Sequence, residues 1–283
     1  MEAVYYGIRK QRGYTMTSHD SIEAFRHERE SLNEIVLKYG KKHIKRFFNL
    51  DTQSYESGAL SAKNKEMLGL VASLVLRCDD CILYHIIRCF EEEVTDDEIE
   101  EVLNIGLVVG GSIVIPHLRR AFKHWEELRM KSINGKNELF ASVFEHIKQL
   151  DGNDFLLNVC KLLQTHVPYY HWVGFYFLDP HNAHELVLGP FVGAPTEHIR
   201  IPVGKGICGQ AVDTKKTFVV QDVSKETNYL SCSSHVKSEI VVPIFKNFEV
   251  IGEIDIDSHD IAPFSDHDRE FLEKICMLIA ERI

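Results

Sequence analysis

The residues with the clearest potential for chemistry lie between positions 204 and 257. This segment contains a glycine-rich turn that carries Cys208, and a second cysteine, Cys232, follows it. The segment ends on a run of strictly alternating polarity at residues 250–257. In a β-strand, such alternation places every second side chain on one face, so three acids lie together. These acids are Glu253, Asp255 and Asp257.

An acidic strand face of this kind is costly unless something offsets its charge. Like charges two residues apart on one face repel one another, and Asp forms strands poorly. No Lys or Arg is interleaved with the acids. The offsetting partner is therefore either the ammonium group of a ligand or a metal ion. The alternative interpretation is a solvated face of an edge strand.

Several segments of the second half resemble the GAF-type free methionine-(R)-sulfoxide reductases. The resemblance covers most of residues 138–283 and predicts an α+β GAF fold with a central antiparallel sheet. It rests on residues 169–176, 188–191, 200–209, 238–243 and 255–257. It implies that Trp172 and Tyr176 face the methyl-sulfoxide end of the substrate, that Glu239 hydrogen-bonds the sulfoxide oxygen, that Asp255 and Asp257 hold the amino group, and that Cys208 and Cys232 form the redox pair.

Sulfoxide reduction suits these residue types. A thiolate attacks the sulfur, an acid protonates the departing oxygen, and a second thiol resolves the sulfenic acid as a disulfide. Cys208 and Cys232 can supply the two sulfurs in either order, and Glu239 is the candidate acid. Crowding by the neighbouring aspartates should raise the pKa of Glu239, which suits a proton donor near neutrality.

One position departs from the family pattern. Members usually carry a third cysteine ten residues before the position of Cys208, and this chain has His198 there. A three-cysteine thiol relay is therefore not expected. The default interpretation of His198 is a surface histidine.

A second group of reactive residues lies in the first half, where Cys78 and Cys81 form a CxxC pair followed by His85. The apolar stripe of a long helical pattern lapses at residues 77–80, so a helix should restart there at the cysteines. The helix dipole lowers the pKa of a thiol at a helix N-terminus, and His85 can take a proton from Cys81. Zinc binding is the competing interpretation, but it needs a further ligand at suitable spacing.

Together with Glu66, this pattern resembles the carboxymuconolactone decarboxylase and alkylhydroperoxidase D superfamily over about residues 55–125. The resemblance implies an all-α fold in which Cys81 attacks, Cys78 resolves, and Glu66 with His85 relays protons. In the peroxidase branch, the residue before the second cysteine is often His, and here it is an aspartate. Two acids oppose a thiolate, so disulfide exchange fits this chain better than strong peroxidase activity.

Composition narrows the class of protein. The 283 residues suit two domains of ordinary size, and the net charge of -10 argues against binding to nucleic acid. No apolar run is long enough to span a bilayer, and the N-terminus lacks the pattern of a signal peptide. We therefore expect a cytoplasmic protein that uses no metal, cofactor or membrane, with redox or packing roles for its seven cysteines.

The chain is expected to divide into four parts. Residues 1–15 lack any period and are interpreted as an arm or an upstream-start artefact before Met16. Residues 16–130 should form the all-α CxxC domain, and the polar, turn-rich residues 131–137 a linker. Residues 138–283 should form the GAF domain.

The leading hypothesis is a fused thiol oxidoreductase. It reduces free L-methionine-(R)-sulfoxide through a Cys208/Cys232 dithiol-disulfide cycle, and its N-terminal domain serves hydroperoxide or disulfide exchange. The first alternative is an alkylhydroperoxidase of peroxiredoxin type that acts through Cys81 and Cys78, with a regulatory GAF domain. The second is a non-catalytic GAF sensor of a small molecule or redox state. The expected partners are the sulfoxide or an organic hydroperoxide, a thioredoxin-like reductant, and a further copy in a homo-oligomer.

Overall fold

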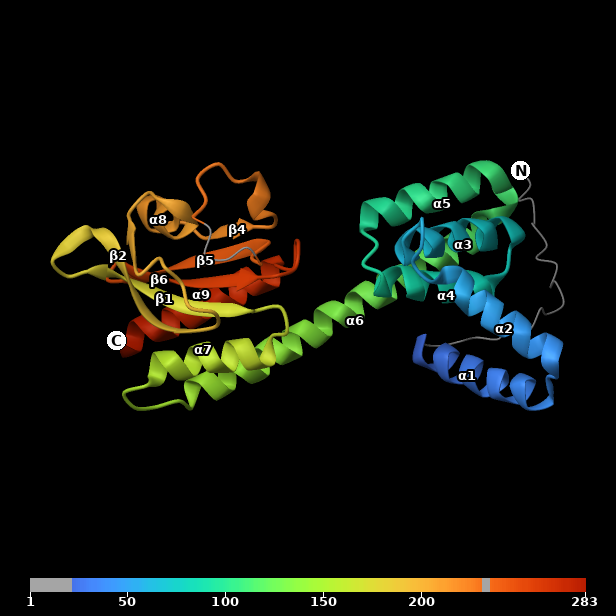
Figure 1. The fold of residues 1–283 in the computed structure, drawn as a ribbon, viewed down its shortest axis with the longest axis horizontal. Helices are drawn as coiled ribbons and strands as arrows, with labels where there is room; N and C mark the ends of the chain where they lie inside the picture. Colours follow the sequence, from blue (N-terminus) through green and yellow to red (C-terminus); the bar gives the residue numbers. More distant parts are fainter. Residues whose placement is uncertain (1–21, 231–234) are drawn as a thin grey trace, which may run out of the picture. The chain divides into compact units, whose positions relative to one another are not determined.

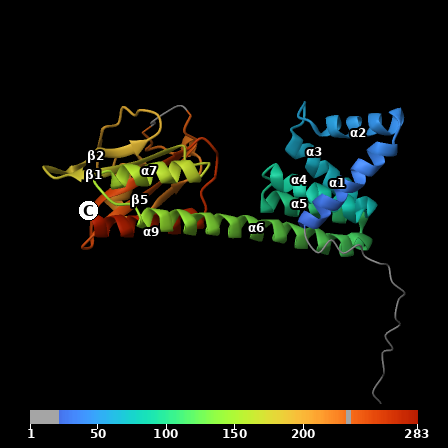
Figure 2. The ribbon, with the colours of Figure 1, turned by 90° about the horizontal axis from the view of Figure 1, so that it is seen from below.

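A computed structural model describes residues 22–230 and 235–283, so the expected arm and the Met16 start lie outside the described residues. The chain divides into two compact units between Ser132 and Ile133. Figures 1 and 2 show a helical first unit and a second unit built on a sheet. The expected pairing of an all-α domain with an α+β GAF domain is confirmed. None of the described helices combines the length and apolar character that crossing a bilayer requires.

The first unit packs its helices around a core that includes Leu70, Leu74 and Ile86. Helix α3 lies against both α4 and α5, which places the reactive residues of α4 beside the acid of α3. The helical elements are α1 (Ile22–Tyr39), α2 (Lys42–Tyr55), α3 (Ala62–Leu76), α4 (Asp79–Glu91), α5 (Asp96–Gly110), the 3-10 turn η1 (Ser112–Val114) and the first part of α6 (Ile115–Lys148).

The predicted helix restart at the CxxC pair is confirmed. Helix α3 ends at Leu76, and Arg77 adopts a left-handed conformation with φ 61°. Cys78 is then the N-cap of α4, where its sulfur accepts a hydrogen bond from the backbone N–H of Cys81 at 3.3 Å. Because Cys78 is the cap and the backbone of Cys81 donates to it, both cysteines lie at the start of the helix.

Residues 131–137, predicted to be a polar, turn-rich linker, are helical, because α6 runs through them without a break, and the division between the two units falls within them. Lys136 contributes to this outcome, since its ammonium donates to Asp268 at 2.9 Å and lies 4.8 Å from the ring centre of Tyr169. These contacts tie the segment to the second unit. They offset the low helix propensity of Gly135, which is about 1 kcal/mol below that of Ala.

The second unit is a six-stranded antiparallel sheet in the order β3-β2-β1-β6-β5-β4. Its strands are β1 (Trp172–Asp179), β2 (Asn182–Val192), β3 (Arg200–Pro202), β4 (Phe218–Val220), β5 (Ser238–Lys246) and β6 (Glu249–Ser258). Its other elements are the end of α6, α7 (Phe155–His166), α8 (Gly206–Thr214), the 3-10 turn η2 (Val223–Lys225) and α9 (Asp266–Arg282).

The two faces of this sheet are covered differently. Helices α6, α7 and α9 pack on one face, over a core that contains Ile254 and Ile256 (Figure 2). Helix α8 lies on the other face, over a smaller cluster that contains Trp172, Tyr176 and Cys208 (Figure 1). The alternating run of β6 therefore sends its isoleucines to the helices and its acids toward α8, as the strand period predicts.

Candidate functional site

Cys208 lies in the first turn of α8, directly above the acidic face of the sheet. Its sulfur is 3.6 Å from Oε1 of Glu239 on β5 and 3.5 Å from Oδ2 of Asp255 on β6. All three side chains are buried. The structure thus brings together a thiol and two carboxyls that are far apart in the sequence.

Strand register sets the positions of the acids. Strand β6 pairs with β1 on one side and β5 on the other, so the edge-strand alternative is wrong. Asp257 lies opposite Glu239 on β5 and opposite Trp172 on β1. Glu253, Asp255 and Asp257 are each at most 1% exposed. The acidic face is therefore a buried cluster enclosed by neighbouring strands.

Burial dominates the protonation of this cluster. It raises the pKa of Asp255 to about 7, although hydrogen bonding with Cys208 and Glu239 acts in the opposite direction. Burial, followed by the charges of Asp255 and Asp257, raises the pKa of Glu239 well above its ordinary value. Burial and the charge of Asp255 raise the pKa of Asp257 and Glu253 in the same way. The expected rise for Glu239 is thus present, and its carboxyl can hold a proton near neutrality.

The two predicted aromatic residues border the same cluster. The Trp172 indole lies against Gly174, where an added Cβ would come within 2.2 Å of the ring, so only glycine leaves the ring this position. Its Nε1 donates to the carbonyl of Ala194 at 3.0 Å, and Tyr176 donates to the carbonyl of His198 at 2.8 Å. His198 thereby contributes backbone support at the position where a third cysteine is usual.

One predicted residue of this site lies outside the described residues, and one residue that was not predicted lies within the site. Cys232 lies outside the described residues, so its distance from Cys208 stays a prediction. Glu253 was not assigned to the site, although it is fully buried and neither carboxyl oxygen has a hydrogen-bond partner among the described residues. The alternation of β6 already contained the signal, because Glu253 precedes Asp255 by one strand period.

In the first unit, the buried acid Glu66 is paired with a histidine and an arginine. Nδ1 of His85 lies 2.7 Å from Oε2 of Glu66, and Nε of Arg88 donates to Oε1 at 3.3 Å. Nε2 of His85 lies 3.5 Å from the hydroxyl of Tyr55. The expected Glu66–His85 pair is therefore present. Arg88 and Tyr55 complete it, and Arg88 could have been found because it follows His85 by three helix positions.

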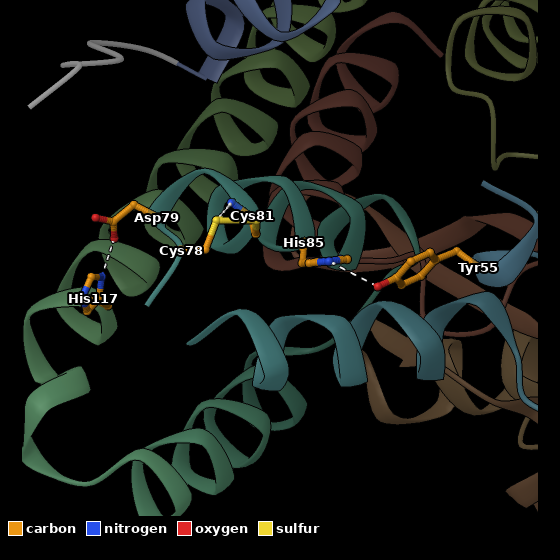
Figure 3. The surroundings of a disulfide bond; sticks show 6 residues. All are labelled: Tyr55, Cys78, Asp79, Cys81, His85 and His117. Carbon is orange, nitrogen blue, oxygen red and sulfur yellow. Dashed lines mark hydrogen bonds and ion pairs between the residues drawn. A yellow bond between two sulfur atoms is a disulfide. The ribbon is translucent and has the colours of Figure 1, made fainter. Parts of the chain in front are cut away.

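The cysteines of this unit form a disulfide between Cys78 and Cys81 at the start of α4, with Cys81 and then His85 following along the helix (Figure 3). Asp79, between the cysteines, lies 2.7 Å from Nδ1 of His117 and accepts hydrogen bonds of 2.9 Å from Arg120. Burial alone would raise the pKa of Asp79, but these two partners lower it overall. Asp79 is one of the two acids expected to oppose a thiolate, and its negative charge is offset by the guanidinium of Arg120.

The zinc interpretation of the CxxC pair gains no support among the described residues. Zinc would need a further ligand beside the CxxC pair, and Cys89 lies later in the same helix α4. Cys89 is fully buried, and burial with the charge of Glu66 raises the pKa of its thiol to about 12. Burial likewise raises the pKa of Cys160 to about 12, and it raises the pKa of Cys276 well above the ordinary value of a thiol. These three cysteines are packing residues, which agrees with the expectation for Cys160 and Cys276.

Comparison with known proteins assigns families to both units. The carboxymuconolactone decarboxylase family matches residues 42–124, and the GAF domain family matches residues 151–283. GAF domain-containing protein A of Dictyostelium discoideum is 42% identical over 124 residues, which are 44% of this chain and 76% of that protein. Free methionine-R-sulfoxide reductase of Escherichia coli strain K12 is 37% identical over 120 residues, which are 42% of this chain and 70% of that protein.

Among solved structures, a carboxymuconolactone decarboxylase family protein of Thermotoga maritima is 58% identical and has a TM-score of 0.38. The match covers 39% of this chain and 94% of that one. The chain therefore belongs to the GAF-domain family that includes the free methionine-R-sulfoxide reductases, and it joins this domain to one of the carboxymuconolactone decarboxylase family.

Proposed function

We propose that the second unit is an oxidoreductase that reduces free L-methionine-(R)-sulfoxide to methionine. The observation that carries this proposal is the position of Cys208, whose sulfur lies 3.6 Å and 3.5 Å from the buried carboxyls of Glu239 and Asp255. A thiol beside proton-bearing acids and an aromatic wall has the parts that sulfoxide reduction needs.

The overall reaction balances without any cofactor. Two thiols and the sulfoxide yield the thioether, one disulfide and one water, and the two thiol electrons reduce the sulfur. The first thiolate bonds to the sulfoxide sulfur while Glu239 protonates the oxygen. The hydroxyl then moves from the substrate sulfur to the cysteine sulfur as the bond between the two sulfurs breaks, which releases the thioether and leaves a sulfenic acid. The second thiol expels water from this sulfenic acid to form the disulfide.

The acids around Cys208 indicate the order of attack. Burial disfavours a thiolate at Cys208, and the geometry places its thiol within hydrogen-bond distance of two carboxyls that can accept its proton. We therefore assign the attacking role to Cys232 and the resolving role to Cys208.

A single-turnover assay without added reductant tests both the activity and this order. A chain with Cys78→Ser and Cys81→Ser, whose first unit can pass on no electrons, should release methionine in an amount equal to the chain and lose two thiols. Adding Cys208→Ser to this chain should release the same methionine but stop at a sulfenic acid, which dimedone traps. Adding Cys232→Ser should abolish methionine release. Sulfoxide turnover that survives in both variants would contradict the proposal, and binding without turnover in wild type would favour the sensor alternative.

The acidic cluster explains why the substrate would be free methionine sulfoxide. Asp255 and Asp257 lie in a buried site where a substrate ammonium would offset their charge. N-acetyl-methionine-(R)-sulfoxide lacks this ammonium and should show a KM raised by about 100-fold or more, which corresponds to one lost charge-assisted contact of about 3 kcal/mol. Equal KM values for the two substrates would contradict this assignment.

We propose disulfide exchange as the activity of the first unit, and the disulfide with its exposed Cys81 supports this role. Because both activities belong to one chain, the dithiol would be present at roughly millimolar local concentration for reduction of the Cys208–Cys232 disulfide. A Cys78→Ser variant should accumulate a mixed disulfide between Cys81 and a cysteine of the second unit, and Cys81→Ser should not. The thioredoxin-like reductant and the homo-oligomer stay predictions.

The same variants test the hydroperoxidase alternative. Cumene hydroperoxide reduction that is lost in Cys81→Ser, in a chain without sulfoxide turnover, would make the first unit the main catalyst. No mixed disulfide in Cys78→Ser under single-turnover conditions would contradict the exchange role.

A further inference from the structure

The acidic cluster has a feature that sulfoxide reduction does not require. Cys208 Sγ and one carboxylate oxygen from each of Glu239 and Asp255 all lie within 4.8 Å of one another, and all three residues are buried. They come from α8, β5 and β6, so three elements converge on one point. Among the residues that the structure describes, this is the group of His, Cys, Asp and Glu side chains that could share a metal ion.

The two sulfur-to-oxygen distances match those of tetrahedral coordination. Zinc binds a thiolate sulfur at about 2.3 Å and a carboxylate oxygen at about 2.0 Å, and a tetrahedral angle then separates the two ligands by about 3.5 Å. The sulfur-to-oxygen distances here are 3.6 Å and 3.5 Å. Three protein ligands in this arrangement leave one position open, as in zinc sites that bind an exchangeable ligand.

A second observation is that several buried carboxyl oxygens of the site lack a hydrogen-bond partner. Both carboxyl oxygens of Glu253, Oδ1 of Asp255 and Oδ1 of Asp257 are buried and have no hydrogen-bond partner among the described residues. Glu253 shares the strand face of Asp255 and is not needed as one of the three ligands. Buried carboxyls are normally hydrogen-bonded, ion-paired or metal-bound, so these orphaned oxygens indicate a cationic ligand.

We infer that Cys208, Glu239 and Asp255 bind a thiophilic divalent cation of the zinc class, and that this cation reversibly blocks the reductase. On binding, the thiol proton and any protons on the two carboxyls pass to solvent, one metal–sulfur and two metal–oxygen bonds form, and no electrons move. Calcium and magnesium fit poorly, because they require six or more oxygen ligands and do not favour a thiolate. The inhibition, though not the binding, rests on the proposed function.

Metal and substrate would compete for two reasons. The metal occupies the thiol that must resolve the sulfenic acid, and its charge takes the place of the substrate ammonium beside the same carboxyls. Zinc should therefore raise the apparent KM for the sulfoxide while a chelator restores full activity.

Binding is tested on the full chain with Cys78→Ser and Cys81→Ser, which removes the other thiol pair. Competition of the reduced protein with a chromophoric zinc chelator should show equimolar zinc. Cys208→Ser, Glu239→Gln and Asp255→Asn should each raise the zinc dissociation constant by about 100-fold, since loss of a ligand exceeds the effect of losing a supporting residue. Glu249→Gln, on the exposed end of the same strand, is the matched control and should leave it unchanged.

Two results would overturn the site. Either the dissociation constant is unchanged in Glu239→Gln and Asp255→Asn, or it rises only in His171→Ala, which would move the metal to the stacked pair of His171 and His259. Circular dichroism of each variant checks that the fold is retained.

Activity separates this inference from the proposed function. A chain that reduces the sulfoxide but binds no zinc overturns the metal site and leaves the reductase intact. A chain that binds zinc through the three ligands but never reduces the sulfoxide supports the site and overturns the reductase together with its inhibition. An active chain that binds zinc without any rise in KM overturns the inhibition.

Discussion

Each unit buries an acid, and the two acids differ in whether the fold provides them with partners. In the first unit, Glu66 is 2% exposed and is paired with His85 and Arg88. In the second unit, Glu253 is fully buried, its oxygens have no hydrogen-bond partner among the described residues, and, against the effect of burial, the Cys208 thiol is the group that acts to lower its pKa. The first unit therefore supplies its own partners for its buried acid, whereas the proposed site of the second unit leaves this role to a bound ligand. These arrangements suit the disulfide exchange proposed for the first unit and the ligand binding proposed for the second.

The most direct test of this difference between Glu66 and Glu253 is to replace each acid with Met, which has a similar volume. Glu66→Met should destabilise the first unit by about 3 kcal/mol, because it strands a buried partner. Glu253→Met should stabilise the second unit by about 1 kcal/mol or more, because it removes an unpaired carboxyl.

Urea unfolding can follow each unit separately, since the two tryptophans of the chain are Trp125 and Trp172. Each variant is measured with the other unit's tryptophan changed to Phe. Changes of the same sign in both units would show that the two acids are not in contrasting environments.

The second unit does supply a counter-charge at one acid, and this exception is also testable. Burial alone would raise the pKa of Asp268, but hydrogen bonds from Ser265, the charge of Lys136 and a hydrogen bond from Tyr169 lower it overall. Lys136→Met should destabilise the second unit by about 2 kcal/mol near neutral pH. Lys148→Met, which loses only a surface pair with Glu145, is the control.

The pH dependence of this effect follows from the lowered pKa. A group with a lowered folded pKa contributes stability above its unfolded pKa, about 3.9 for Asp, and loses it as the pH falls through the folded value. The difference between wild type and Lys136→Met should therefore shrink below about pH 3.9. A difference that stays constant well below about pH 3.9 would show that Lys136 acts by packing alone.

Each unit also uses a glycine to make room for a functional ring. An added Cβ would lie 2.2 Å from Trp172 at Gly174 and 2.5 Å from His85 at Gly69. Gly174→Ala should lower kcat/KM for the sulfoxide by about tenfold, or about 1.4 kcal/mol, and spare disulfide exchange. Gly69→Ala should show the reverse pattern. Loss of both activities in either variant would indicate general unfolding rather than a local effect.

The smallest expected effect concerns the segment where the units meet in sequence. Gly135 lies inside α6, and an added Cβ there meets nothing within 4 Å. Gly135→Ala should therefore raise helix stability by about 0.5 to 1 kcal/mol, the difference in helix propensity. An unchanged or lower melting temperature would show that this segment is not helical in solution.

Local patterns predicted much of this arrangement. The lapse at residues 77–80 located the start of α4, and the period of two placed Asp255 and Asp257 on one face. Tertiary context accounts for what was missed. The edge-strand alternative was open because strand order is set by pairing between distant segments. The helix through residues 131–137 depends on the contact of Lys136 with Asp268, which no local propensity contains.

The carboxyl oxygens of β6 that lack hydrogen-bond partners also link the stability of the second unit to ligand binding. Any cation that enters the cluster and binds only the folded state must raise the melting temperature of the second unit, in proportion to the logarithm of its concentration above its dissociation constant. Thermal denaturation can therefore rank amines, amino acids and metals as ligands before any turnover is measured. Because burying these acids costs stability, the melting temperature of the second unit would report which ligand is bound beside them.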